Sequence, residues 1–166
     1  MSKLKIVVTG PVFAGKTTFI HSLADRPPVS TEQSIRNPSD KEKTTVALDF
    51  ARTTVAGHPV NLFGTPGQER FQYMRELLVE GTDGLVLLVP GDQEDGLEKT
   101  LEIMAPLTTD TTPPLVIGVT RTDLAENALL EKTRQTLGSR VHRIEQIDAR
   151  EEDHCRDLVT TLINQV

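Results

Sequence analysis

The sequence has 166 residues, of which 37% are hydrophobic and 25% charged, and its formal net charge is −6. This length and balance suit one packed domain and exclude a disordered tail or a fibrous repeat, while the negative charge argues against nucleic-acid binding through a basic face. The longest apolar run, 85–89, is too short to span a membrane. We recognise no signal peptide and no lipid-anchor motif, and the single cysteine, Cys155, cannot form an internal disulfide, so we expect a cytoplasmic protein.

Short β-rich runs alternate with helical stretches, a pattern that favours an α/β fold with a sheet between layers of helices. In chain order we expect a strand over 4–9, a helix over 15–24, a strand over 46–51, a hairpin turn at 57–58, a strand over 59–63, a helix over 67–80, a strand over 85–89, a helix over 93–105, a strand over 115–120, a helix over 125–137, a strand over 141–147 and a last helix carrying the apolar residues between 155 and 166. Residues 26–44 are polar, contain two adjacent prolines and have almost no apolar periodicity, so we interpret them as a functional loop without regular structure. The six strands and five helices predict a single domain, 1–166.

The segment GPVFAGKT at 10–17 fits the phosphate-loop pattern G-x-x-x-x-G-K-[ST] and stands between the first predicted strand and the first predicted helix. Its glycines let backbone N–H groups turn toward phosphate oxygens, and the helix N-terminus adds partial positive charge. Lys16 supplies a charge for the β- and γ-phosphates, and the Thr17 hydroxyl is a hard ligand for Mg²⁺. We therefore expect a nucleoside triphosphate to bind at Gly10, Val12, Phe13, Ala14, Gly15, Lys16, Thr17 and Thr18.

Two further segments extend this pattern: TVALDF at 45–50, and GTPGQERF at 64–71 after the third predicted strand. Together with the phosphate loop they resemble the Ras-like small GTPases, in particular the prokaryotic branch with the gliding-motility, polarity and conservon-type GTPases. The resemblance covers nearly the whole chain. It implies a three-layer P-loop NTPase fold (a Ras-like G domain) with a six-stranded, mostly parallel sheet, one antiparallel edge strand and five helices. It also implies a switch I over about 26–45 and a switch II over about 64–80.

The same resemblance implies roles for residues of the two switches. Thr45, with Thr44 as the neighbouring candidate, would bind Mg²⁺ and sense the γ-phosphate. Gly67 would donate its N–H to the γ-phosphate, and Gln68 would orient the attacking water. The implied ligands are GTP or GDP with Mg²⁺, the implied metal ligands are Thr17 and Thr45, and the implied catalytic residues are Lys16, Thr45, Gly67 and Gln68.

Two positions depart from the family pattern near the phosphates. Gly64 stands where the family usually has an aspartate that reaches Mg²⁺ through water, which predicts weaker Mg²⁺ binding or a different carboxylate in its place. Asp49 and Asp92 are the two candidates, and the third possibility is that neither substitutes. Val12 stands where relatives often carry glycine, and its β-branched side chain would crowd the site around Gln68, which predicts slow hydrolysis.

The guanine-recognition motif of the family appears here as TRTD at 120–123. Asp123 would accept hydrogen bonds from guanine N1–H and its amino group, although an aspartate at this place can also be a helix N-cap. Arg121 would lie over the base, and Thr120 would replace the asparagine that ties the base loop to the phosphate loop. Ala149 would offer its backbone N–H to guanine O6.

Three functions remain open on these residues. The first is a GTP-binding switch that slowly hydrolyses GTP. The second is a nucleotide-binding interaction module with negligible turnover, as Gly64 and Val12 suggest. The third is a small P-loop kinase, which would need an arginine-bearing lid for which no insertion is long enough. By resemblance, the partners of a switch would be a roadblock-type activator or exchange factor and an effector at the two switches, where Phe71, Tyr73 and Met74 cannot all face the core.

Overall fold

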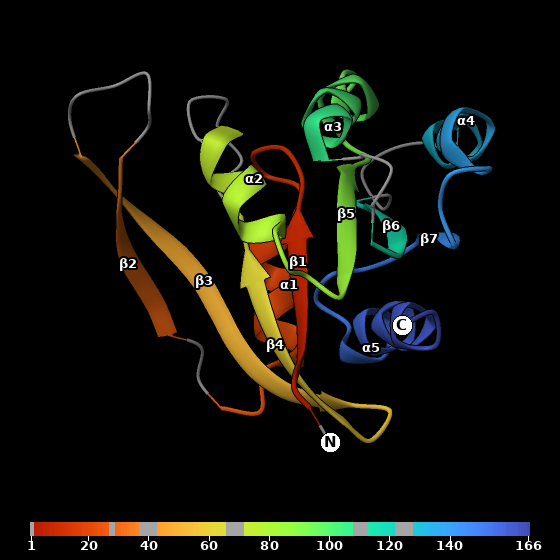
Figure 1. Ribbon diagram of the computed structural model, residues 1–166. Helices are drawn as coiled ribbons and strands as arrows, with labels where there is room; N and C mark the ends of the chain where they lie inside the picture. The colour runs from red at the N-terminus through yellow and green to blue at the C-terminus, as the bar shows by residue number, and fades with distance from the viewer. Residues whose placement is uncertain (1, 27–28, 37–42, 66–71, 108–112, 122–127) are drawn as a thin grey trace.

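The computed structural model describes residues 2–26, 29–36, 43–65, 72–107, 113–121 and 128–166. Strands and helices alternate along the chain except for three successive strands after the first helix (Figure 1). The strands are β1 (Leu4–Thr9), β2 (Val29–Arg36), β3 (Lys43–Val55), β4 (His58–Gly64), β5 (Gly84–Pro90), β6 (Leu115–Thr120) and β7 (Arg143–Gln146). The helices are α1 (Lys16–Leu23), α2 (Gln72–Val79), α3 (Gly96–Met104), the 3₁₀ turn η2 (Ala105–Leu107), α4 (Ala128–Leu137) and α5 (Glu152–Ile163).

All seven strands form one sheet in the order β2-β3-β4-β1-β5-β6-β7. The pairs among β4, β1, β5, β6 and β7 are parallel, whereas β3 is antiparallel to both β4 and β2. β3 is therefore the one described strand that runs against the others. The predicted α/β fold class, mostly parallel with one antiparallel strand, is confirmed, and β3 lies one strand in from the edge because β2 covers it.

The prediction that 26–44 lacks regular structure was wrong for the part that forms β2 and the start of β3. β2 pairs with β3 from Val29 opposite Phe50 to Arg36 opposite Lys43, at one side of the molecule (Figure 1). A strand at the edge of a sheet is held by backbone hydrogen bonds to a single neighbour and needs no continuous apolar face. The polar sequence of β2 therefore carries no apolar period by which it could be recognised.

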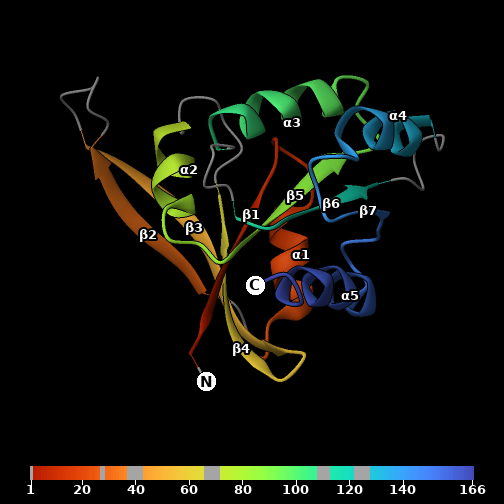
Figure 2. The same ribbon diagram turned by 45° about the vertical axis from the view of Figure 1, so that its right-hand side comes forward.

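Helices cover both faces of the sheet, as Figure 2 shows with α1 and α5 on one side and α3 and α4 on the other. Alternate residues of β1 serve the two layers: Ile6 and Val8 pack with α1 and α5, whereas Val7 packs with the opposite layer. Every residue of β5 is buried, as is typical of a central parallel strand with helices on both faces. The core is thus split by the sheet into two apolar layers.

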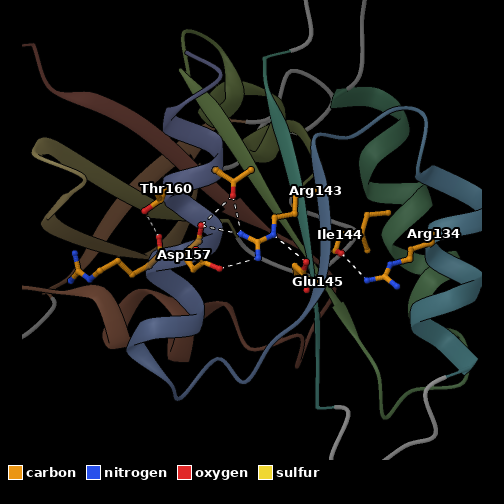
Figure 3. Close-up of polar contacts among 8 residues, drawn as sticks. Arg134, Arg143, Ile144, Glu145, Asp157 and Thr160 are labelled. Carbon is orange, nitrogen blue, oxygen red and sulfur yellow. Dashed lines mark hydrogen bonds and ion pairs between the residues drawn. The ribbon is translucent and has the colours of Figure 1, made fainter.

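The edge strand β7 is tied to the helices on either side of it (Figure 3). Arg143 of β7 forms ion pairs with Asp157 of α5 at 2.9 Å and with Glu145 at 3.2 Å. From α4, Arg134 donates to the carbonyl of Ile144 at 3.5 Å. These contacts hold β7 between α4 and α5, just before the turn that enters the site.

The sheet order determines where a ligand can bind. β1 lies between β4 and β5, so the connections after β1 and β4 leave the sheet in opposite directions. In open α/β sheets ligands bind at the carboxyl ends of the strands where the order reverses in this way. The carboxyl ends of β1, β4 and β6, at which the three predicted nucleotide motifs begin, lie at this edge.

Candidate nucleotide-binding site

The phosphate loop has the backbone conformation that its glycines allow. Gly10 has φ 155°, and a Cβ added there would lie 2.6 Å from the carbonyl oxygen of Leu88, so a side chain at this position is excluded. Gly15, the residue before α1, has φ 99°, in the left-handed region that favours glycine. Between them, Phe13 also has positive φ, 64°, and its side chain is 71% exposed. The loop therefore turns tightly from β1 into the N-terminus of α1.

Lys16 lies against this loop. Its ammonium donates to the carbonyl of Gly10 at 2.9 Å and to the carbonyl of Pro11 at 2.7 Å. The pKa of Lys16 is lowered to about 8, chiefly by burial and also by the positive charge of Arg75 on α2, while the carboxylate of Asp49 opposes both effects. An anion placed at the loop would restore the charge that burial disfavours.

The Thr17 hydroxyl contacts a carboxylate from a distant part of the chain. It donates to Asp49 Oδ2 on β3 at 2.5 Å. Thr45, the predicted metal ligand, is paired with Ser34 in the β2–β3 ladder, four residues before Asp49 and hence about 13 Å away along the strand. The structure thus brings Asp49 to Thr17 and does not bring the backbone of Thr45 beside it.

Asp49 also fills the space next to Gly64. A Cβ added at Gly64 would lie 3.2 Å from the Cβ of Asp49 and 2.8 Å from Cδ1 of Ile20. The other carboxylate that the sequence offered, Asp92, forms an ion pair with Arg121 at 3.3 Å instead. Of the two candidates, only Asp49 therefore contacts the phosphate-loop threonine.

The expected tie between the base loop and the phosphate loop is present. The buried Thr120 hydroxyl donates to the carbonyl of Ala14 at 2.6 Å and lies 3.4 Å from the carbonyl of Val89. Thr120 thus links the end of β6 to the loop after β1 across the intervening strand β5. The next residue, Arg121, has φ 57° and turns the chain out of β6. Asp123 lies outside the described residues.

A cavity of about 530 Å³ opens beside this tie. Its size is that of an ordinary small-molecule site. It is lined by residues at the start of α1, at the end of β6 and from the end of β7 into α5, namely Gly15, Thr18, Thr120, Arg121, Gln146, Ile147, Asp148, Ala149, Arg150 and His154. The predicted nucleotide-binding residues on both sides of the cavity therefore face one space.

Sequence reasoning missed the polar residues around Ala149. Asp148 accepts from Arg150 Nε at 2.9 Å and Nη2 at 2.8 Å, and the backbone N–H of Asp148 donates to His154 Nδ1 at 3.0 Å. The hydrogen bonds from Arg150 lower the pKa of Asp148 to about 2. The carbonyl of Ala149 accepts from the hydroxyl of Ser22. Asp148 and Arg150 flank Ala149 after β7, which is their one signal in the sequence, whereas His154 lies on α5 and Ser22 on α1.

The start of the predicted switch II is fixed to β1. The buried Thr65 hydroxyl donates to the Thr9 hydroxyl at 2.7 Å, and the Thr65 N–H donates to the carbonyl of Val8 at 3.0 Å. The two predicted catalytic residues that follow, Gly67 and Gln68, lie outside the described residues. Phe71 lies outside them as well.

Comparison with known proteins agrees with this geometry. The family model of the elongation factor Tu GTP-binding domain matches residues 1–162. The chain belongs to the P-loop GTPases. This GTPase is 31% identical over 124 residues to an uncharacterized protein, MJ1339 of Methanocaldococcus jannaschii, with 75% of this chain and 73% of that protein covered. It is 26% identical over 149 residues to the mutual gliding-motility protein MglA of Myxococcus xanthus, with 82% and 76% covered. The resemblance to prokaryotic small GTPases is thereby confirmed.

Solved structures agree on the fold of this GTPase. The G domain of the FeoB iron transporter of T. maritima superposes with a TM-score of 0.67 at 18% identity, covering 99% of both chains. The cytosolic domain of FeoB in its apo form gives a TM-score of 0.70 at 17% identity, covering 98% of this chain and 64% of that one.

Within the described residues, none of the helices combines the length and apolar character needed to cross a membrane.

Proposed function

We propose that this GTPase is a molecular switch that binds GTP with Mg²⁺, hydrolyses it slowly to GDP, and signals through residues 26–45 and 64–80. The observation that carries the proposal is the hydrogen bond from Thr120 to Ala14, which joins a phosphate loop of the expected conformation to the base side of a single cavity. A nucleotide in that cavity would have its phosphates at Lys16 and its base near Arg121, Asp123 and Ala149.

The residues present fit a magnesium ion. The Thr17 hydroxyl and the carboxylate beside it are hard oxygen donors, which Mg²⁺ prefers. Among the described residues no group of three or more His, Cys, Asp or Glu side chains could hold a metal by itself, so the nucleotide would supply the remaining ligands. When bound, the ion would neutralise charge on the β- and γ-phosphates.

Thr45 is the proposed sensor of the γ-phosphate. Because its place in β3 is about 13 Å along the strand from Asp49, it would reach the nucleotide only if this part of the β2–β3 pair rearranged. The switch movement that we propose therefore includes β2. Gly67 and Gln68 are proposed to act in the same state, the first by donating its N–H to the γ-phosphate and the second by orienting water.

A nucleotide-binding module with negligible turnover is the second candidate. The observation that favours it is Val12, whose side chain is 38% exposed on the phosphate loop, where it would crowd an attacking water and the groups that orient it. Lys16 and Thr17 would bind nucleotide equally well in such a module. Turnover therefore separates the two candidates, whereas binding does not.

Partners and location follow from the family alone. We propose a roadblock-type activator or exchange factor and an effector that reads the two switches, in the cytoplasm. The relative MglA is by its name a gliding-motility protein.

Binding and turnover of the purified chain test the proposal. We expect GTP and GDP to bind in the presence of Mg²⁺ and ATP to be rejected in isothermal titration. Phosphate release should be slower than about 1 s⁻¹, the low end of ordinary enzymes, and Gln68→Leu should slow it further without loss of GTP binding. Equal affinity for ATP and GTP would contradict the switch. Equal phosphate release by wild type and Gln68→Leu would contradict the water-orienting role of Gln68, and no measurable release by wild type would favour the module.

A further inference from the structure

The carboxylate of Asp49 occupies a position that the sequence of the phosphate-binding segments does not suggest. Asp49 directly precedes Phe50, which pairs with Phe63 in the β3–β4 ladder. Antiparallel pairing therefore sets Asp49 beside Gly64, the residue after Phe63. From there its Oδ2 reaches the Thr17 hydroxyl at the start of α1. The β3–β4 register therefore places the carboxylate of Asp49 beside the phosphate loop.

The side chain of Asp49 lies next to the position that a side chain at Gly64 would occupy. A Cβ at position 64 would lie 3.2 Å from Asp49 Cβ, 3.6 Å from Asp49 Oδ2 and 2.8 Å from Ile20 Cδ1. The last distance is shorter than nonbonded carbon atoms approach, so a side chain at 64 would have to displace its neighbours. Glycine at 64 therefore leaves this space open, whereas a side chain there would press on Ile20 and on the Cβ of Asp49.

The contact with Thr17 prepares that hydroxyl for a cation. A hydroxyl has one proton and two lone pairs, and here the proton points to Asp49. The lone pairs are then free for a metal, and a carboxylate behind a ligand raises its basicity and fixes its orientation. Asp49 also acts on Lys16, whose positive charge its carboxylate favours. The group therefore lies within electrostatic reach of both residues that would bind the phosphates and the metal.

We propose that Asp49, delivered by β3, is the acidic group of the magnesium site, and that it replaces a carboxylate at position 64. The inference rests on the proposed binding of Mg²⁺ with a guanine nucleotide. It excludes Asp92, which is paired with Arg121. It also explains why glycine stands at 64: this residue provides the space for Asp49.

The first experiment measures how much Mg²⁺ contributes to GDP affinity. The dissociation constant of a fluorescent GDP is determined at millimolar Mg²⁺ and again with EDTA, and Mn²⁺ binding to the GDP complex is followed by electron paramagnetic resonance. Asp49→Asn keeps the side-chain shape and an acceptor for Thr17. We expect it to weaken Mn²⁺ binding about 10- to 100-fold, the usual cost of removing a group that supports a metal ligand, with GDP affinity in EDTA within about twofold of wild type.

Asp95→Asn is the matched control, because Asp95 is an exposed aspartate that forms an ion pair with Lys99 on the surface of α3. It should keep the Mg²⁺ and Mn²⁺ dependence of wild type. Unchanged Mn²⁺ binding in Asp49→Asn would overturn the inference. If wild type bound no guanine nucleotide at all, the proposed function would fail instead, so the two failures are distinguishable.

The second experiment exchanges the two positions. In a background carrying Ile20→Val, which removes the methyl closest to position 64, the Mn²⁺ affinities of Asp49→Gly, Gly64→Asp and the double variant are compared. We expect each single variant to bind Mn²⁺ less tightly than the background and the double variant to recover at least tenfold over Asp49→Gly. Thermal unfolding identifies any member that is not folded. A folded double variant without recovery would overturn the claim that one position replaces the other.

Discussion

Lys16 has two loop carbonyls as partners, and both contacts can be exchanged for phosphate oxygens. Removing the ammonium should therefore reduce the free energy of GTP binding by about 1.5–3 kcal/mol, the usual contribution of a hydrogen bond to a charged group. We expect Lys16→Ala to weaken GTP binding roughly 10- to 100-fold in isothermal titration. Lys99→Ala, an exposed lysine of α3, is the control. Wild-type affinity in Lys16→Ala would contradict the placement of the phosphates.

The lowered pKa of Lys16, about 8, predicts a pH dependence of binding. A bound triphosphate favours the charged ammonium, so above pH 8 binding must take up a proton. GTP affinity should consequently fall between pH 8 and 9.5, by at most about tenfold per pH unit. Lys16→Ala should lose this slope while keeping its lower affinity. Titration calorimetry in two buffers of different ionisation enthalpy measures the proton uptake directly, and no uptake at pH 9 would contradict the role of Lys16.

Asp123 is proposed to read the base. Adenine has an acceptor at N1 and no amino group at C2, so it would leave the carboxylate unpaired, and sites of this kind discriminate by up to about 10⁴–10⁵. Asp123→Asn exchanges one acceptor for a donor and should lose GTP affinity while gaining affinity for xanthosine triphosphate. Competition binding of GTP, ATP and XTP to wild type and to Asp123→Asn measures the base preference of each protein. A variant with unchanged base preference would make Asp123 a helix cap.

At the residue scale the sequence predicts groups whose role depends on their own segment. The phosphate loop could be recognised because its glycines and Lys16 act within a few residues, and Thr120 because it ends a predicted strand. The choice between Asp49 and Asp92 could not be made, since it depends on strand register across 32 residues. Asp148 and His154 were missed for the same reason: they belong to the site through tertiary packing.

At the scale of elements, α5 packs closely on β5 because Gly84 has no side chain. A Cβ there would lie 2.7 Å from Leu162 Cγ and Cδ2. Gly84→Ala should therefore lower the free energy of unfolding by about 1–3 kcal/mol, the usual cost of overpacking. Chemical denaturation measures the change. In the background Leu162→Ala, where the clashing atoms are absent, the same substitution should cost less, and an equal cost in both backgrounds would contradict this packing.

Elements buried on both faces were predictable, and β2 was not. The apolar runs of β1, β5 and β6 identify central strands wherever they fold, because two layers of helices require them. β2 exists only through its hydrogen bonds to β3, and its polar sequence is equally compatible with a loop.

At the scale of the whole molecule, ligand binding should stabilise the fold, because the cavity is lined by residues that follow three different strands, β1, β6 and β7. A ligand at 100 times its dissociation constant adds about 2.7 kcal/mol to stability, which corresponds to roughly 5–10 °C in the unfolding temperature for a chain of this length. We expect this shift with Mg²⁺ and GDP in differential scanning fluorimetry. ATP at the same concentration should give no shift, and an equal shift would contradict guanine selectivity.

The shared space of Gly64 and Asp49 also restricts how such a chain can evolve. A single substitution to aspartate at 64 would crowd a second carboxylate against Asp49, and a single loss at 49 would remove the acidic group that we propose for the metal site. A lineage that acquires one arrangement is therefore held in it, because every one-step path to the other passes through a chain with a defective metal site. Glycine at the end of β4, together with aspartate fifteen residues earlier on the antiparallel strand, should thus be inherited as a pair, and the pair marks a branch of descent in sequences whose structures have not been determined.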